Sequence, residues 1–292
     1  MFVKKSVTLY MNQKLLSEDQ IKEFREEGFI LLKGFYDLDK EIGPIQFGVW
    51  KILGILFKKY NIPVEQKSFS TDTFDFGYQE LIAANRAYGG EVYDAVKQIP
   101  GFMRFFSLEK NEHLFSQIRG TDLPGIAAAG YGIRIDNPNE EKFRSLWHYE
   151  YRDQLRSIDG IVFWSPLVPI LFETGPVQIC PKSHIGGLRR SFRNDPEKSD
   201  RSGAYAMRLE NEEELLKQYE VIEPLCEPGD LVLMDFLTLH CSGKNVSNRS
   251  RWSMQFRYFN FNHPSGIEIK WTGCVANGVQ LKDVHPELII EN

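Results

Sequence analysis

A histidine and a glutamate two residues apart are the first candidates for chemistry in this sequence. His148 and Glu150 lie in the stretch SLWHYEYRDQL, residues 145–155. If this stretch is a strand, both side chains point to one face, with Cα atoms roughly 7 Å apart, and both can reach one ion. One imidazole and one carboxylate leave a divalent ion mostly hydrated. The pair therefore predicts half of a metal site, and a further ligand must come from elsewhere.

His240 is the best candidate for that further ligand. It ends the predicted strand LVLMDFLTLH, residues 231–240, and a histidine there lies at the rim of a sheet, where a pocket opens. Taken alone, such a histidine is more often structural than a ligand. Asp153 lies an odd number of residues from His148, on the opposite face of a continuing strand, so it ranks below Glu150 as a ligand.

The stretch RWSMQFRY, residues 251–258, alternates strictly between polar and apolar residues and predicts a strand. The polar face of such a strand is ordinarily exposed to solvent. If helices pack on the apolar face, the polar face turns instead to the interior of a β-sandwich or barrel. Arg251 then points into a cavity, and Arg257 lies on the same face.

The elements that hold these residues begin with a helix. Ser17 is predicted to cap it, with Gln20 completing a capping box and Gly28 ending the helix. A strand, FILLKGF, follows at residues 29–35. From there to about residue 120 the apolar residues have mainly helical spacing.

After about residue 120 the chain consists of short β-prone runs separated by turns. We expect a mainly β fold with N-terminal helices, formed as a single domain over residues 1–292. Residues 1–120 are expected to form a helical buttress and residues 121–292 a β core. A charged segment at about 187–218 is expected to be an insertion in that core.

Composition favours a globular protein without a nucleic-acid partner. Of the 292 residues 42% are hydrophobic and 26% charged, and the net charge is -5. No basic stripe with interleaved aromatic residues is present, which argues against nucleic-acid binding. The four cysteines have no CxxC spacing, so neither a zinc knuckle nor a disulfide framework is predicted.

A membrane span is not expected. The longest apolar stretch, IGPIQFGVWKILGILF at residues 42–57, is interrupted by Lys51 and is shorter than the roughly 20 residues that a span requires. The N-terminal residues lack the apolar core of a secretory signal. We therefore expect a cytoplasmic protein.

Four stretches in a fixed order carry a family resemblance. They are LSEDQIKEFREEGFILLKGF (16–35), WHYE (147–150), ETGPVQICPKSHIGG (173–187) and GDLVLMDFLTLHCSGKNVSNRSRWSMQFRY (229–258). They resemble, in turn, the opening helix and strand, the Trp-His-x-Asp motif, the Pro-Gly-Ser-His stretch and the distal histidine and arginine run of the phytanoyl-CoA dioxygenase family. These are iron(II)- and 2-oxoglutarate-dependent oxygenases.

The resemblance implies an iron site. His148, Glu150 and His240 then form a 2-His-1-carboxylate facial triad that holds Fe(II) and leaves open positions for 2-oxoglutarate and O2. The fold it implies is a double-stranded β-helix, a jelly roll of the cupin type. The implied reaction yields succinate and carbon dioxide and oxidises a substrate, by hydroxylation in the default case. Desaturation, epimerisation and further oxidation stay open.

The same resemblance implies a co-substrate site. The arginine at the position of Arg251, eleven residues after His240, grips the far carboxylate of 2-oxoglutarate. Its planar fork suits that task because it can form two parallel hydrogen bonds with a carboxylate. Ser242 lies close by, and Ser253 is assigned to the same site.

Some positions depart from the family pattern. Glu150 replaces the commoner aspartate and is one methylene longer. Thr174, Pro176 and Lys182 differ from the usual residues of the third stretch. These differences bear on the substrate more than on iron binding.

A polar small molecule is the expected substrate, and the basic residues suggest that it is anionic. Arg134 precedes the metal pair on a predicted strand, and Lys182, with His184 nearby, starts a group of cations that continues to residue 193. These are the candidate substrate-binding residues. The charged insertion is expected to act as a lid whose basic end meets the ligand.

Two other functions remain open. A non-redox cupin, an isomerase or hydrolase, would hold zinc or manganese at the same ligands but would not use Arg251. A jelly-roll binding module without catalysis would leave the burial of three converging ligands unexplained.

Overall fold

A six-stranded antiparallel sheet lies at the centre of the computed structural model, which describes residues 14–195, 206–274 and 278–291. Its order is β1, β9, β5, β11 and β2, and β3 pairs with β11 beside β2. These strands are β1 (Phe29–Leu32), β2 (Pro124–Ile126), β3 (Gly132–Asp136), β5 (Gly160–Pro166), β9 (Leu231–Asp235) and β11 (Arg251–Asn260).

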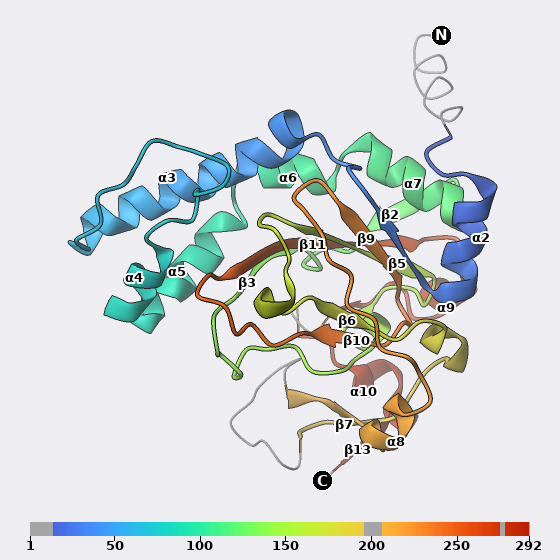
Figure 1. Ribbon diagram of the computed structural model, residues 1–292. Coiled ribbons are helices and arrows are strands. Elements are labelled where there is room, and N and C mark those ends of the chain that lie inside the picture. Colours follow the sequence, from blue (N-terminus) through green and yellow to red (C-terminus); the bar gives the residue numbers. More distant parts are fainter. Residues whose placement is uncertain (1–13, 196–205, 275–277, 292) are drawn as a thin grey trace.

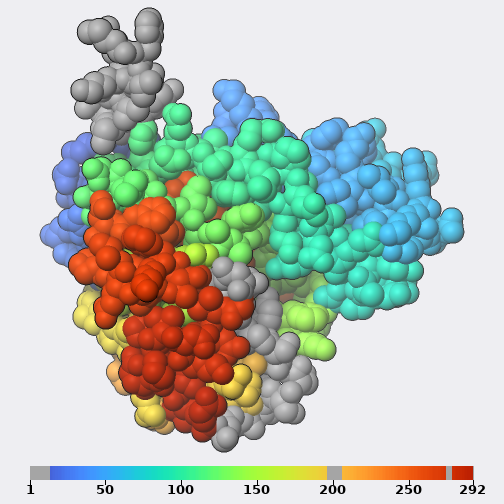
Figure 2. Space-filling model, turned by 180° about the vertical axis from the view of Figure 1, so that it is seen from behind, coloured from blue at the N-terminus to red at the C-terminus, as the bar shows by residue number. Residues whose placement is uncertain are grey.

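Helices of the N-terminal part cover one face of this sheet (Figure 1). Seen from behind, their residues lie along the top and on both sides of the molecule, with the C-terminal residues below (Figure 2). They are α2 (Glu18–Glu27), α3 (Gly43–Lys59), α4 (Tyr78–Ala84), α5 (Arg86–Val96), α6 (Pro100–Phe106) and α7 (Glu109–Arg119). A π-helical turn at Leu38–Ile42 leads into α3. No helix in the part of the chain that the structure describes is long and apolar enough to cross a membrane.

The alternation of polar and apolar residues in β11 matches the different surroundings of its two faces. Its apolar residues are fully buried, and their rings meet aromatic residues of the helical layer: Phe256 lies 5.8 Å from Phe105 and Tyr258 lies 5.9 Å from Phe115, between ring centroids. Burial of each such ring stabilises the fold by roughly 1.5 to 3 kcal/mol. Because the helices cover this face, the polar face of β11 turns inward, as the sequence predicted for that case.

A smaller sheet lies opposite the inward face of the large one. Strand β10 (His240–Ser242) pairs with β6 (Val177–Ile179), and an isolated bridge joins His148 to His240. Residues of both sheets line one cavity between them. Two facing antiparallel sheets flanked by helices agree with the predicted mainly β, jelly-roll fold class.

The first helix forms as predicted. Ser17 Oγ accepts from the N–H of Gln20 at 3.1 Å, and the Gln20 side chain accepts from the N–H of Ser17 at 2.9 Å. Gly28 ends the helix in the left-handed conformation, with φ of 76°, which glycine adopts without strain. The Gly28 carbonyl then accepts from the Thr238 hydroxyl at 2.7 Å, which ties α2 to the segment before His240.

The remaining elements are short. They are β4 (Gln154–Leu155), β7 (Ser191–Phe192), β8 (Arg208–Leu209), β12 (Gly273–Cys274), β13 (Ile289–Ile290), α8 (Glu212–Leu216), α9 (Pro264–Glu268), α10 (Leu281–Val284) and the 3-10 turns Glu150–Arg152, Phe172–Thr174, Ser183–Gly186 and Pro286–Leu288. The predicted insertion contains β7, β8 and α8, and β13 pairs with β7. Residues 196–205 of the expected lid lie outside the described residues.

Candidate metal centre

The backbone brings the candidate ligands together through one bridge and one turn. His240 begins β10, and its N–H and C=O pair with the C=O and N–H of His148 at 2.9 and 3.0 Å. The expectation that one strand carries both His148 and Glu150 is wrong, because Glu150 begins the 3-10 turn Glu150–Arg152. The turn nevertheless directs the carboxylate toward both imidazoles.

Three ligand atoms converge at this place. One atom from each of His148, Glu150 and His240 lies within 4.8 Å of the other two. Oε2 of Glu150 is 3.7 Å from Nε2 of His240 and 4.0 Å from Nε2 of His148. All three residues are buried, with exposed fractions of 8% or less. The predicted metal-ligand set is therefore assembled in the interior.

Hydrogen bonds to carbonyls fix the tautomer of both histidines. Nδ1 of His148 lies 2.8 Å from the Leu146 carbonyl, and Nδ1 of His240 lies 2.9 Å from the Thr238 carbonyl. A carbonyl oxygen only accepts, so each Nδ1 must carry the proton. The unprotonated Nε2 atoms therefore face Glu150, an arrangement typical of histidines that bind a metal.

The electrostatics keep this donor set in its metal-binding form. Burial and the neighbouring His240 and Arg152 hold the pKa of His148 well below its ordinary value, so its imidazole is neutral. Burial alone would raise the pKa of Glu150, but the charge of Arg257 and the two histidines outweigh it and hold that pKa well below the ordinary range. His148 is therefore a neutral imidazole and Glu150 a carboxylate, the forms that bind a metal.

One atom of the centre shows that a cation fits here. Among the described residues, Oε2 of Glu150 is a buried oxygen without a hydrogen-bond partner, whereas Oε1 accepts from Nε of Arg257 at 2.9 Å. An unsatisfied buried acceptor costs about 1 to 3 kcal/mol, and more when it is charged. A divalent ion between Oε2 and the two Nε2 atoms would remove that cost. The donor set suits iron(II), and three protein ligands leave positions open.

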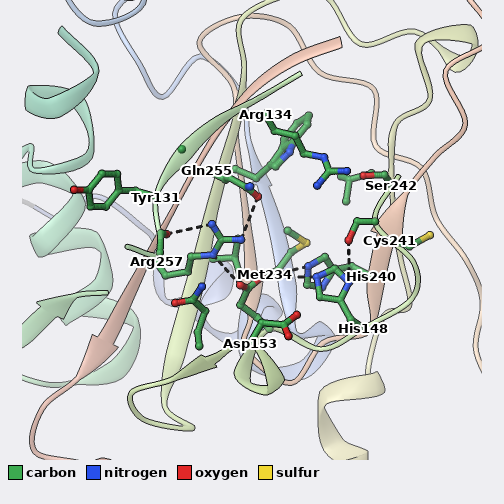
Figure 3. A pocket seen from close by; sticks show the side chains of 18 of the residues that line it. Tyr131, Arg134, His148, Asp153, Met234, His240, Cys241, Ser242, Gln255 and Arg257 are labelled. Carbon is green, nitrogen blue, oxygen red and sulfur yellow. Dashed lines mark hydrogen bonds and ion pairs between the residues drawn. The ribbon is translucent and has the colours of Figure 1, made fainter. Parts of the chain in front are cut away.

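A cavity of about 190 Å³ opens beside the triad. Of the predicted co-substrate residues, Arg251 and Ser242 line it, and so does Arg134. Figure 3 shows His148 and His240 on one side of the cavity, facing Arg257, with Asp153 between them at the lower edge. Ser253 is fully buried and is not among the described residues that line this cavity, although it shares the strand face of Arg251. Its side chain is the shortest on that face.

The sequence did not single out Asp136, which partners both candidate arginines. Its Oδ2 lies 2.8 Å from Nη2 of Arg251, and Nε of Arg134 donates to both of its oxygens at 2.9 Å. Nη2 of Arg251 also donates to Ser242 Oγ at 2.9 Å, and Nη1 donates to the Gly175 carbonyl. Asp136 faces Arg251 because β3 pairs with β11 in that register. In the stretch GIRID, residues 132–136, charged residues alternate with isoleucine, and this alternation was the one sequence signal for Asp136.

Lys182 and His184 lie elsewhere. Nζ of the exposed Lys182 pairs with Glu27 at 3.2 Å, and Nε2 of His184 lies 3.1 Å from the Arg25 carbonyl, so both contact α2. Neither is among the described residues that line the cavity. The structure therefore does not bring these two predicted substrate residues to the metal centre.

The basic group at the start of the insertion is also placed away from the cavity. Arg189 donates to the Ser183 carbonyl at 2.9 Å, and Arg190 pairs with Glu210 at 3.2 Å. Arg193 lies 4.0 Å from Glu291. These contacts hold the insertion together, and the lid stays a prediction.

Two cavity residues were missed because of the turn at Glu150. Asp153 was placed on the opposite face of a continuing strand, but the 3-10 turn redirects it, and both Asp153 and Gln154 line the cavity. Burial raises the pKa of Asp153, against the charge of Arg152. Gln255 and Arg257 line the cavity from β11, as the polar face of that strand indicated.

The fold and this site define an enzyme class, the iron(II)- and 2-oxoglutarate-dependent oxygenases. Residues 144–253, less than half of the chain, match the family model described as Phytanoyl-CoA dioxygenase (PhyH). The match includes His148, Glu150, His240 and Arg251, and it confirms the predicted family resemblance over this segment.

Solved structures share the fold. EctD from S. alaskensis, with 2-oxoglutarate and 5-hydroxyectoine, is 17% identical, with a TM-score of 0.55 over 88% of this chain and 82% of that chain. SnoK, a non-heme alpha ketoglutarate dependent carbocyclase from nogalamycin biosynthesis, is 13% identical, with a TM-score of 0.52 over 87% and 89%. AviO1 from Streptomyces viridochromogenes Tue57 is 16% identical, with a TM-score of 0.51 over 87% and 99%. No curated protein matches this chain in sequence.

Proposed function

We propose that His148, Glu150 and His240 hold iron(II) and that the adjoining cavity binds 2-oxoglutarate and a polar small molecule, which is oxidised. The observation that carries the proposal is the unpartnered Oε2 of Glu150, which faces two unprotonated Nε2 atoms. Bound iron(II) would supply the redox chemistry that couples decarboxylation of 2-oxoglutarate by O2 to oxidation of the substrate.

The residues around the triad have separate tasks in this proposal. Arg257 holds Oε1 of Glu150, so Oε2 is the oxygen presented to the metal. Arg251, whose charge is buried beside the cavity, takes the far carboxylate of 2-oxoglutarate, and Ser242 orients its guanidinium. The site lies between two sheets, and charge interactions in such buried surroundings are stronger than in bulk water.

An anaerobic titration tests this function. Addition of iron(II) and then 2-oxoglutarate should produce a weak visible charge-transfer band, because the 2-oxo acid must bind the metal directly. With zinc in place of iron no band is expected. A protein that binds iron(II) but gives neither the band nor succinate would be a non-redox cupin, and one that binds no metal would be a binding module.

Two finer expectations from the sequence stay predictions. One is the anionic character of the substrate. Of the residues proposed to bind an anionic substrate, Arg134 alone lines the cavity, and its guanidinium is already paired with Asp136. A cytoplasmic location is the other.

A further inference from the structure

Two acceptor oxygens at the cavity wall have no donor. In the described part of the chain, Oδ1 of Asp153 and Oε1 of Gln154 are buried side-chain oxygens without a hydrogen-bond partner, and each residue is 8% exposed. Both residues line the same cavity as the triad, and Figure 3 shows Asp153 at its edge, near His148. Each unsatisfied acceptor costs about 1 to 3 kcal/mol, so a ligand that donates to them is favoured.

The Asp153 carboxylate is held in place by a neighbouring cation, and the backbone of Gln154 is held by a strand. Nη2 of the buried Arg152 donates to Oδ2 of Asp153 at 3.2 Å, which orients the carboxylate and leaves Oδ1 without a donor. The backbone of Gln154 pairs with β12. The Gln154 side chain lies against Gly130, where an added Cβ would be 2.6 Å from Oε1 of Gln154. The two residues therefore form one wall of the cavity.

The metal and the co-substrate do not account for these acceptors. Neither residue belongs to the group of three ligands. 2-Oxoglutarate is a dianion, and a carboxylate oxygen such as Oδ1 of Asp153 repels it. The second organic molecule that the cavity must hold is the substrate.

We propose that Asp153 Oδ1 and Gln154 Oε1 bind O–H or N–H donors of the substrate. The substrate class is then a polyhydroxy or amino compound, neutral or cationic, in place of an anion. This inference rests on the proposed function, since it needs the metal and 2-oxoglutarate in the same cavity.

The substitution Asp153→Asn gives the sharpest test. Nη2 of Arg152 requires an oxygen, so the new amide must turn its oxygen to Arg152 and its NH2 group to the cavity. The change thereby converts an acceptor into a donor with little change in shape. Gln154→Met removes the other acceptor, and Gln154→Glu keeps it as a matched control.

Proton relaxation by a paramagnetic ion measures binding without turnover. The full chain is loaded with manganese(II) and saturating 2-oxoglutarate at pH 8. Glycerol, ethanolamine and acetate serve as probes, and the zinc(II)-loaded protein gives the background. We expect relaxation of glycerol and ethanolamine protons, and little for acetate. Asp153→Asn should lower ethanolamine affinity roughly tenfold and raise that of acetate, and Gln154→Met should weaken glycerol binding several-fold.

The remaining outcomes decide against the proposal. The proposal is overturned if acetate protons relax as strongly as those of glycerol and ethanolamine, or if no probe relaxes above background. It is also overturned if probe binding is unchanged in both Asp153→Asn and Gln154→Met. Glycerol binding should survive in Gln154→Glu, and its loss there as in Gln154→Met would also count against the acceptor role. Failure of manganese(II) to bind the wild-type chain is seen before any probe is added, and it would refute the proposed function itself.

Discussion

Arg257 donates its Nε–H to Oε1 of Glu150 at 2.9 Å, and the other oxygen of that carboxylate faces His148 and His240. The guanidinium is itself fixed, because Nη1 donates to the Gly130 carbonyl and Nη2 to Gln255 Oε1, both at 3.1 Å. Arg257, on β11 of the large sheet, thus determines which oxygen of Glu150, on the 3-10 turn, is available to bind a metal.

Loss of Arg257 should weaken metal binding. In Arg257→Gln the Glu150 carboxylate loses its charged partner and is free to rotate, and changes to such supporting residues typically cost 10- to 100-fold in metal affinity. Iron(II) titration under anaerobic conditions measures the effect. Arg249→Gln is the matched control, because Arg249 pairs with Asp75 at 2.7 Å and does not contact the triad. Equal metal affinity in both variants would contradict the role.

His240→Ala should abolish iron-dependent succinate formation, because one of three ligands is lost. The fold should persist, since the backbone pairing of residue 240 with His148 does not need the imidazole. His113→Ala, on α7 in the helical layer, should retain activity. Stoichiometric iron binding with normal turnover in His240→Ala would refute the triad.

Arg251→Ala should weaken 2-oxoglutarate binding roughly 10- to 150-fold, which corresponds to the 1.5 to 3 kcal/mol of a charge-assisted hydrogen bond. Iron affinity should change less, because Arg251 pairs with Asp136 and Ser242 and not with a ligand. The concentration of 2-oxoglutarate that gives half of the charge-transfer band measures the effect. An unchanged value would assign the anchor to another cation of the cavity.

The stability of the metal-free protein should fall as the pH decreases below 6.5. The pKa of His148 is lower in the folded chain than its ordinary value of 6.5, so the unfolded chain takes up a proton that the folded chain does not. Such a group destabilises the fold by up to about 1.4 kcal/mol per pH unit. Urea unfolding at pH 7.5 and 5.5 measures this loss. It should be smaller in His148→Gln, and an equal loss in both proteins would contradict the prediction.

Local sequence patterns determined several elements of this protein. The capping box at Ser17 and the αL glycine at Gly28 depend on hydrogen bonds within one helix, so the order of residues suffices to predict them. The alternation in residues 251–258 likewise predicted β11, since the period of a strand is fixed by its backbone. The ligand types at His148, Glu150 and His240 were also evident from the sequence, as was the family motif order.

Tertiary structure alone decided which side chains meet. The register of β3 against β11 decides that Arg251 pairs with Asp136, which is 115 positions away in the sequence. The approach of a turn to β11 decides that Glu150 pairs with Arg257, 107 positions away. The sequence placed Asp153 on the wrong face because the strand was assumed to continue, whereas the 3-10 turn after His148 changes the direction of every later side chain. Side-chain direction beyond such a turn depends on packing between distant segments, and no local pattern of residues specifies it.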